Sequence, residues 1–209
     1  MIGKNNISMS VIRRLPRYYR YLSELEEKGI VRVSSKELSE KMGFTASQIR
    51  QDFNCFGGFG QQGYGYAVTN LKETIGNILG IQEKRKCILI GAGNLGSALL
   101  SIDYNKRGFE LSGVFDSSPN KIGTEIRGHK ILSMDELEEF CANEKPVMAI
   151  ICIPSDSVVE TCEKLVSFGI KAFWNFSHYD LSLNFSSDII VENVHLNDSL
   201  MTMSYMLSD

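Results

Sequence analysis

The sequence predicts an α/β protein in which an N-terminal winged helix-turn-helix domain precedes a Rossmann-like, doubly wound parallel sheet. Three observations lead to this fold class. Short helical segments separated by glycines fill the first section, strand-like and helical segments alternate from Lys86 onward, and a complete G-x-G-x-x-G motif joins the first of those strands to a helix. We therefore expect domains at 1–80 and 81–194, followed by a C-terminal helix at 195–209.

Helical spacing predicts two helices near the start of the chain. Pro16 can open the first helix, apolar residues then recur every three to four positions, and Gly29 ends it. The second helix is expected over 35–42, because Ser34 can serve as its N-cap and Glu37 completes a capping box three residues later.

A third helix follows so closely that the pair predicts a helix-turn-helix motif. Gly43 breaks the second helix, and Thr45 or Ser47 can cap a third helix that runs to about Phe53. Two helices joined by a short, glycine-containing turn are typical of DNA-binding proteins, which place the second helix in the major groove.

The stretch 56–66, FGGFGQQGYGY, contains five glycines and four aromatic residues and has no helical period. It predicts a turn between two short strands, which would form the wing of a winged helix. A flexible linker is the alternative, although linkers rarely carry interleaved aromatic residues. A further helix is expected over 68–80, and the polar stretch IQEKRK after it marks the predicted domain boundary.

The second section alternates between strand-like and helical segments. Its strand-like segments are KCILIGAG, LSGVFD, PVMAIICIP, KAFWNF and DIIVEN, and its helical segments are NLGSALLSI, MDELEEFCANE and DSVVETCEKLVSFG. Continuous apolar strands with helical crossovers predict a parallel sheet that is buried on both faces. His129 is expected in a polar turn, and Asn197, Asp198 and Ser199 are expected to cap an apolar helix in the tail.

The strongest chemical signal is the hexapeptide Gly91-Ala92-Gly93-Asn94-Leu95-Gly96 between a strand and a helix. Its first glycine makes a tight turn, its second lets the backbone approach a pyrophosphate, and its third allows close helix packing. The next strand ends in Asp116, where a carboxylate can accept hydrogen bonds from an adenosine ribose. Because a carboxylate repels a 2′-phosphate, NAD(H) is the expected ligand. A Rossmann-like fold that binds another nucleotide, or none, is the alternative.

The net charge of −3 hides an uneven distribution that favours a nucleic-acid partner for the first section only. Residues 1–80 hold 11 basic and 7 acidic side chains, whereas the remainder holds 11 and 18. No apolar window suits a membrane span, and the N-terminus lacks the apolar core of a secretory signal. The five cysteines include no CxxC pair, which argues against a metal site and favours the cytoplasm.

The basic excess coincides with the helix-turn-helix pattern, which predicts double-stranded DNA as the partner. Serine, glutamine and arginine side chains suit contacts with phosphates and base edges. A solvated helix face is the alternative for such a run. The expected DNA contacts are Arg14 and Arg17, from the arginines that cluster around the first helix, and Ser47, Gln48, Arg50 and Gln51 on the recognition helix.

Catalytic groups are sparse, so a regulator is favoured over an enzyme. His178 follows a strand end and His195 precedes the tail helix, but neither they nor His129 form a recognisable catalytic arrangement. Two alternatives stay open. One is an NAD-dependent oxidoreductase with a helical oligomerisation module, and the other is a nucleotide-binding protein of the CoA-ligase type.

From about residue 10 to the tail, the sequence resembles the redox-sensing transcriptional repressor family called Rex. The matching stretches are RLPRYYRYLSELEEKG, SSKELSEKMGFTASQIRQDFNCFGGFGQQGYGY, GAGNLGSALL, FDSSPNKIG, NFSHYDL and VENVHLNDSL, in the family's order. The resemblance implies a homodimer whose C-terminal helices are swapped between subunits. It also implies repression of genes of anaerobic and fermentative metabolism, with release of operator DNA when NADH binds.

The resemblance also assigns roles to individual residues. Tyr104 matches a tyrosine that lies near the nicotinamide, and Arg20 matches an arginine that links the winged helix to that site. Gln51 stands where lysine is common and Gln62 stands in the wing where arginine is common, so each removes a positive charge from the DNA-facing surface. His195 stands where some members have an aspartate that partners the arginine and the tyrosine in the switch.

Overall fold

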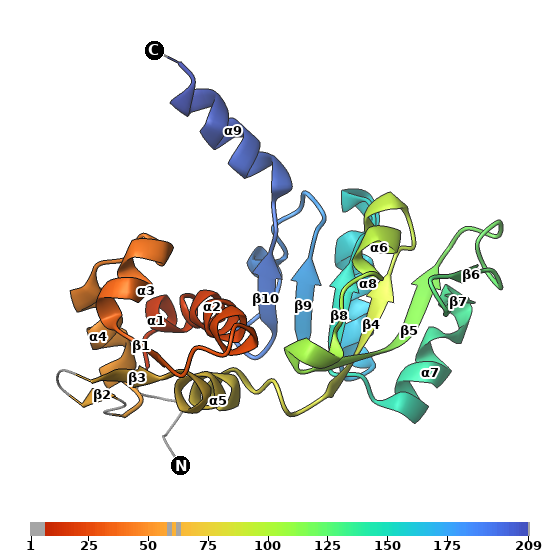
Figure 1. Cartoon of the computed structure of the whole chain (residues 1–209). Helices are drawn as coiled ribbons and strands as arrows, with labels where there is room; N and C mark the ends of the chain where they lie inside the picture. Colours follow the sequence, from red (N-terminus) through yellow and green to blue (C-terminus); the bar gives the residue numbers. More distant parts are fainter. Residues whose placement is uncertain (1–6, 58–59, 62–63, 209) are drawn as a thin grey trace. The chain divides into compact units, whose positions relative to one another are not determined.

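The computed structural model describes residues 7–57, 60–61 and 64–208, and the chain divides into two compact units at 1–82 and 83–209 (Figure 1). The break follows the helix α5 and lies within the polar stretch IQEKRK, which was predicted as the domain boundary. Each unit has its own buried apolar core.

The first unit is a winged helix. Its helices are α1 (Met9–Ile12), α2 (Leu15–Glu27), α3 (Ser35–Met42), α4 (Ala46–Asn54) and α5 (Val68–Leu79). Its strands are β1 (Arg32–Val33), β2 (Gly60–Gln61) and β3 (Gly65–Ala67), which form an antiparallel sheet in the order β1-β3-β2. The predicted helix-turn-helix is confirmed as α3 and α4. The capping box of Ser34 and Glu37 begins α3, Gly43 ends it at φ +70°, and Thr45 accepts a hydrogen bond from Gln48 N to cap α4.

Within the described part of the glycine-rich stretch, β2 and β3 pair as the predicted wing, and two of its aromatic residues are anchored in the core. Phe56 and Tyr66 are buried, and the Tyr66 ring packs edge-on against Phe53 with 5.0 Å between centroids. Gly65 has φ +68°, and a Cβ there would lie 2.7 Å from the carbonyl oxygen of Val33, so only glycine fits between the strands. Gln62 lies outside the described residues.

The second unit is built on a seven-stranded sheet in the order β10-β9-β8-β4-β5-β7-β6, in which all neighbours are parallel except β6 and β7. Its strands are β4 (Arg85–Ile90), β5 (Phe109–Asp116), β6 (Glu125–Ile126), β7 (His129–Ser133), β8 (Met148–Ile151), β9 (Ala172–Asn175) and β10 (Ile190–Asn193). Its helices are α6 (Asn94–Leu99), α7 (Leu137–Glu144), α8 (Ser155–Ser167) and α9 (Leu196–Met206), with short 3-10 turns at Asn105–Arg107, Met134–Glu136 and Leu181–Leu183.

Helices cover both faces of this sheet, which explains its continuous apolar strands. Ile88 and Ile90 of β4 lie in one buried cluster with side chains of α7 and α8. Cys87 and Leu89 point the other way and join a cluster with Leu99 and Leu100 at the end of α6. The doubly wound arrangement is therefore confirmed.

Three local expectations are wrong. The IRGHKI segment is a hairpin rather than a simple turn, because Arg127 and Gly128 adopt positive φ and let His129 begin β7. Helix α6 ends at Leu99, three residues before its expected end, because the following amides form tighter i→i−3 bonds. Helix α9 begins at Leu196, so its N-cap is His195 and not the polar triplet after it.

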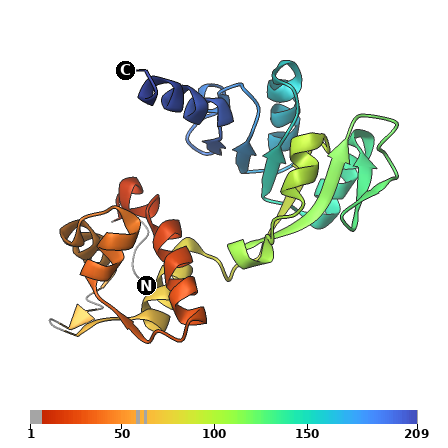
Figure 2. The same ribbon diagram turned by 45° about the horizontal axis from the view of Figure 1, so that its top comes forward.

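Helix α9 extends from β10 away from the sheet in both ribbon views (Figures 1 and 2). None of its residues is buried, although one of its faces is apolar. Within the described part of the chain, no helix combines the length and the apolar character needed to cross a membrane.

Candidate functional sites

The three motif glycines occupy three different environments after β4. Gly91 has φ +96°, and a Cβ there would lie 2.5 Å from the carbonyl oxygen of Cys152. A Cβ on Gly96 would lie only 1.9 Å from the Gly91 carbonyl oxygen, so α6 packs directly on the loop. A Cβ on Gly93 would meet nothing within 4 Å. The loop is therefore tight and closely packed at two glycines and open at the third, which is the geometry that lets a pyrophosphate approach the backbone.

A pocket of about 340 Å³ opens in front of this loop, at the carboxyl ends of β4, β5 and β8. These strands surround the point where the chain reverses its direction of travel across the sheet, which is where open α/β sheets bind ligands. The wall is mixed apolar and polar, and Asn94 and Leu95 are not part of it. The lining residues are Ile90, Gly91, Gly93, Asp116, Ser117, Lys121, Met134, Cys152, Ile153, Pro154, Ser157 and Thr161.

Asp116 lies at the end of β5 in this pocket and is 8% exposed. Its Oδ2 accepts hydrogen bonds from Ala92 N at 2.8 Å and from Lys121 Nζ at 3.1 Å, and its Oδ1 accepts one from Ser118 N at 2.8 Å. Burial alone would raise the pKa of Asp116, but these three bonds more than offset it and hold that pKa below its usual range. The carboxylate is thus ionised at neutral pH and tied to the glycine loop.

Tyr104 lies in the core on the α6 face of the sheet and is not among the lining residues. It is buried, its hydroxyl donates to the Leu99 carbonyl oxygen at 3.1 Å, and burial raises the pKa of that hydroxyl well above its usual range. Cys152 connects the two places, because it lines the pocket and also packs against the cluster that contains Tyr104. The expected proximity of Tyr104 to a nicotinamide stays a prediction.

The recognition helix α4 exposes Ser47, Arg50 and Gln51 to solvent. Arg50 Nη1 donates to Ser35 Oγ at 3.2 Å, which ties it to the start of α3. Arg17 is also exposed, with Nη2 donating to the Met42 carbonyl oxygen at 2.9 Å. Because these partners are neutral, both arginines keep a net positive charge that is available to a phosphate.

Arg14 and Gln48, which the sequence places among the DNA contacts, instead converge on the buried carboxylate of Asp52. Arg14 binds it through two hydrogen bonds of 2.7 Å, and Gln48 Nε2 donates to it at 3.0 Å. The Tyr18 hydroxyl donates a fourth bond at 2.7 Å. Burial would raise the pKa of Asp52, but these donors lower it overall. The group locks α4 to α2, so Arg14 and Gln48 have fewer donors left for DNA than their positions suggest.

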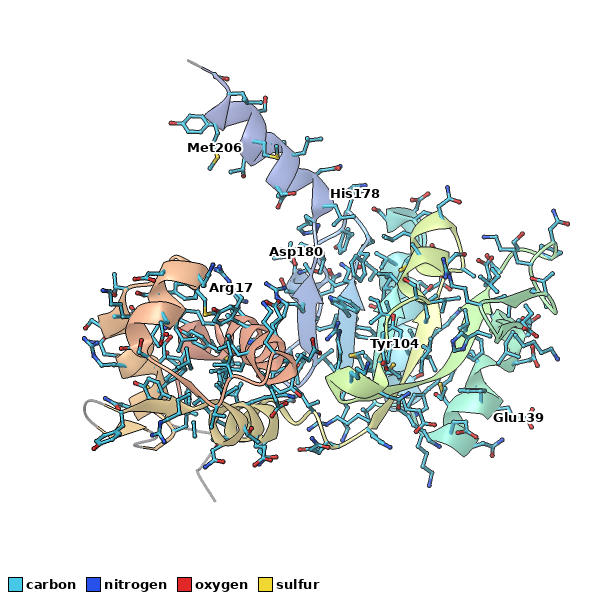
Figure 3. All side chains as sticks on the ribbon, viewed as in Figure 1. Arg17, Tyr104, Glu139, His178, Asp180 and Met206 are labelled. Atoms are coloured by element: carbon cyan, nitrogen blue, oxygen red, sulfur yellow. The ribbon has the colours of Figure 1, made fainter. Side chains whose placement is uncertain are left out.

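The remaining expected switch residues, Arg20 and His195, are not among the described residues that line the pocket. Arg20 is exposed and makes no hydrogen bond or ion pair with any residue that the structure describes. His195 is half-buried at the start of α9. Asp180, which is labelled in Figure 3, lies between β9 and β10. Hydrogen bonds from Ser182 and Asn193, with a smaller contribution from His195, lower the pKa of Asp180. Among the described residues, no group of three or more His, Cys, Asp or Glu side chains could hold a metal ion.

Sequence reasoning missed two residues at these sites, Asp52 and Lys121. Asp52 shares a helix face with the buried Ile49 and Phe53, and a carboxylate at such a position signals a partner of opposite charge. Lys121 follows Asp116 by five residues in a turn, where a chain reversal can return a side chain to the strand end. Both signals were readable in the sequence.

Comparisons with known proteins agree with this architecture. Residues 6–54 match a family described as "Putative DNA-binding protein N-terminus", and residues 82–179 match one described as "CoA binding domain". A redox-sensing transcriptional repressor Rex from Clostridium perfringens is 51% identical over 100% of this chain and 98% of its own length.

Solved structures of a repressor called RSP are equally similar. The complex of RSP with beta-NAD+ and operator DNA is 52% identical, with a TM-score of 0.89 over 96% of this chain and 92% of RSP. The complex of RSP with beta-NADH is 49% identical, with a TM-score of 0.87 over 96% and 94%. Because half of the residues are identical across essentially the entire length, this chain belongs to the Rex family of redox-sensing transcriptional repressors.

Proposed function

We propose that this chain is an NADH-responsive transcriptional repressor, which binds operator DNA as a homodimer and releases it when NADH binds. The observation that carries the proposal is the presence of both halves of such a device in one chain. A winged helix with an exposed recognition helix precedes a sheet whose switch-point pocket is bounded by a dinucleotide-type glycine loop. The RSP complexes, with NAD+ and operator DNA and with NADH, support the same pairing of ligands.

The pocket residues fit NAD(H). The open side of Gly93 leaves room for the pyrophosphate, and the ionised Asp116 can accept hydrogen bonds from ribose hydroxyls. Apolar side chains from Ile90, Met134 and Ile153 supply a wall for a flat ring. NADH and NAD+ differ by one positive charge on the nicotinamide, so the discrimination between them must arise around that ring, where apolar groups together with Tyr104 would favour the neutral form.

The response to NADH follows from a population shift. NADH must bind the arrangement of the dimer that cannot engage DNA more tightly than the arrangement that can. A tenfold release of operator requires a difference in binding free energy of about 1.4 kcal/mol between the two arrangements. On this view Arg20, Tyr104 and His195 belong to the coupling between the two units.

The homodimer is supported by the apolar face of α9. Leu196, Leu200 and Met203 are each more than half exposed although they recur at helical spacing on one side of the helix. An apolar stripe of this kind is typical of a surface that another chain covers. We infer that the partner is a second copy, with the helices exchanged between subunits as the resemblance implies.

We also infer that the chain is a regulator that acts in the cytoplasm and is not an enzyme. None of its three histidines is among the described residues that line the pocket, and the titratable side chains that do line it are Asp116, Lys121 and Cys152. Burial raises the pKa of Cys152 to about 12, so its thiol is neutral and a poor nucleophile or base.

One experiment tests the repressor. A duplex selected from a random pool by this protein is labelled, and its binding is followed by fluorescence anisotropy with and without NADH over a range of salt concentrations. We expect NADH, but not NAD+, to weaken binding at least tenfold. Unchanged affinity in the presence of saturating NADH would refute the switch. Competition by CoA with NADH would instead favour the nucleotide-binding alternative.

A further inference from the structure

Lys121 is the cationic side chain among the described residues that line the pocket. Its ammonium lies 3.1 Å from Asp116 Oδ2, on the carboxylate that the ribose is expected to meet. The side chain is 37% exposed and lines the pocket, so the ion pair does not bury it. A ligand that reaches Asp116 therefore reaches a carboxylate and an ammonium together.

The backbone fixes Lys121 in this position. Lys121 N donates to the Ser118 carbonyl oxygen at 3.0 Å, and the Lys121 carbonyl oxygen accepts hydrogen bonds from Thr124 N at 2.9 Å and Thr124 Oγ1 at 2.6 Å. Two consecutive turns thus hold the residue on both sides. Ser118 N in turn donates to Asp116 Oδ1, so the carboxylate and the turn that carries the ammonium are built as one unit.

This pairing changes the electrostatic argument for discrimination between NAD(H) and NADP(H). A lone carboxylate repels the 2′-phosphate of NADP(H), which carries about two negative charges near neutral pH. The adjacent ammonium attracts the same phosphate, and charge-assisted hydrogen bonds from lysine to phosphate are strong. Asp116 therefore repels the phosphate, and Lys121 attracts it. A ribose hydroxyl, by contrast, can donate a hydrogen bond to Asp116 and accept one from Lys121.

We propose that Lys121 is a second ribose-recognition residue and that it sets how strongly the pocket discriminates against a phosphorylated ribose. The inference rests on the proposed NADH site. It states that this chain binds NADPH more weakly than NADH but measurably, because Lys121 offsets the repulsion by Asp116. Removal of the ammonium makes the pocket more selective for NADH and weaker overall.

The test is the ratio of the dissociation constants of NADPH and NADH, measured by calorimetry on the full chain and on Lys121→Met. We expect NADH affinity to fall about threefold and NADPH affinity about thirtyfold, so that the ratio rises about tenfold, or 1.4 kcal/mol. Lys121→Arg should restore the ratio to within about threefold of the original. Lys130→Met is the matched control, because Lys130 is an exposed lysine of the neighbouring β7 that does not line the pocket.

The outcomes separate the inference from the proposed function. If the unaltered chain binds NADH and Lys121→Met leaves the ratio unchanged, Lys121 plays no part in specificity and the inference is overturned while the NADH site stands. If Lys121→Met weakens both ligands by the same factor, the ratio again does not change, the role of Lys121 is only structural, and the inference is overturned. If the unaltered chain binds neither ligand, the proposed function fails and the inference with it.

Discussion

Replacement of Asp52 by asparagine tests whether the recognition helix is held by a buried charge. Asparagine keeps the shape of the side chain but removes the negative charge that two Arg14 hydrogen bonds of 2.7 Å now neutralise. Removal of one partner from a buried ion pair typically costs about 3–5 kcal/mol. Arg14 is 22% exposed and can regain water, so we expect the free energy of unfolding of the first unit to fall by about 2–3 kcal/mol.

Urea denaturation of the full chain can isolate this loss, because the two units carry different reporters. The single tryptophan, Trp174, lies in β9 of the second unit, whereas far-UV circular dichroism also reports the helices of the first unit. With an m value of about 1.5 kcal/mol/M, the loss lowers the urea midpoint of the first unit by about 1.5 M. The tryptophan transition should not move.

Glu40→Gln is the matched control, because Glu40 is an exposed carboxylate on α3 of the same unit and its loss should change stability by less than about 0.5 kcal/mol. The reasoning is refuted if Asp52→Asn shifts the dichroism midpoint no more than Glu40→Gln does. A shift of the tryptophan transition by the same amount would show that the substitution acts on the whole chain and not on the link between α2 and α4.

The same carboxylate gives the first unit a defined response to acid. Because folding lowers the pKa of Asp52, its contribution to stability is complete above the unfolded pKa of about 3.9 and is lost as the pH falls through the lower folded value. The stability difference between the original chain and Asp52→Asn should therefore be constant near neutral pH and shrink below about pH 4. A difference that shrinks between pH 5 and pH 7 would assign the effect to another group.

Three further predictions concern the glycine loop, the two glutamines expected at the DNA and the apolar face of α9. Gly93→Ala should leave the urea midpoint unchanged but weaken NADH binding at least tenfold in calorimetry. Gly96→Ala should instead lower the free energy of unfolding of the second unit by about 2 kcal/mol, because its Cβ would collide with a carbonyl oxygen. Equal effects of the two substitutions on stability would contradict the different roles of these glycines. Gln51→Lys with Gln62→Arg should tighten operator binding and steepen its salt slope by about one for each added phosphate contact, and salt-titrated anisotropy without any change would show that these positions face away from DNA. Leu200→Asp on the apolar face of α9 should convert a dimer to a monomer in sedimentation velocity, and an unchanged dimer mass would place the interface elsewhere.

The sequence predicted those features that depend on local signals. The capping box at Ser34, the break at Gly43 and the glycine motif each act through the backbone of a few neighbouring residues, and all appear where the pattern put them. The strand β7 was missed because its pairing with β5 and with the short β6 is a tertiary contact without a long apolar run. The predicted start of α9 is too late, because Asn197, Asp198 and Ser199 are residue types that commonly cap helices. In the structure the backbone is extended as far as His195, and the helix begins at the next residue, Leu196.

Pairing within the fold also limits what a count of charges can say about DNA binding. The basic excess of the first section includes Arg14, but Asp52 neutralises that charge at 2.7 Å, so a phosphate near α4 experiences little of it. Arg17 and Arg50 contribute fully, because a carbonyl oxygen and a hydroxyl group do not cancel a charge. Gln51 is exposed, so a lysine at this position would add a charge on the solvent-facing side of α4 and should act on DNA almost undiminished. Substitution of Arg14 should instead lower the stability of the fold more than it lowers the salt slope of binding, and this contrast separates positions that hold the recognition helix from positions that contact DNA.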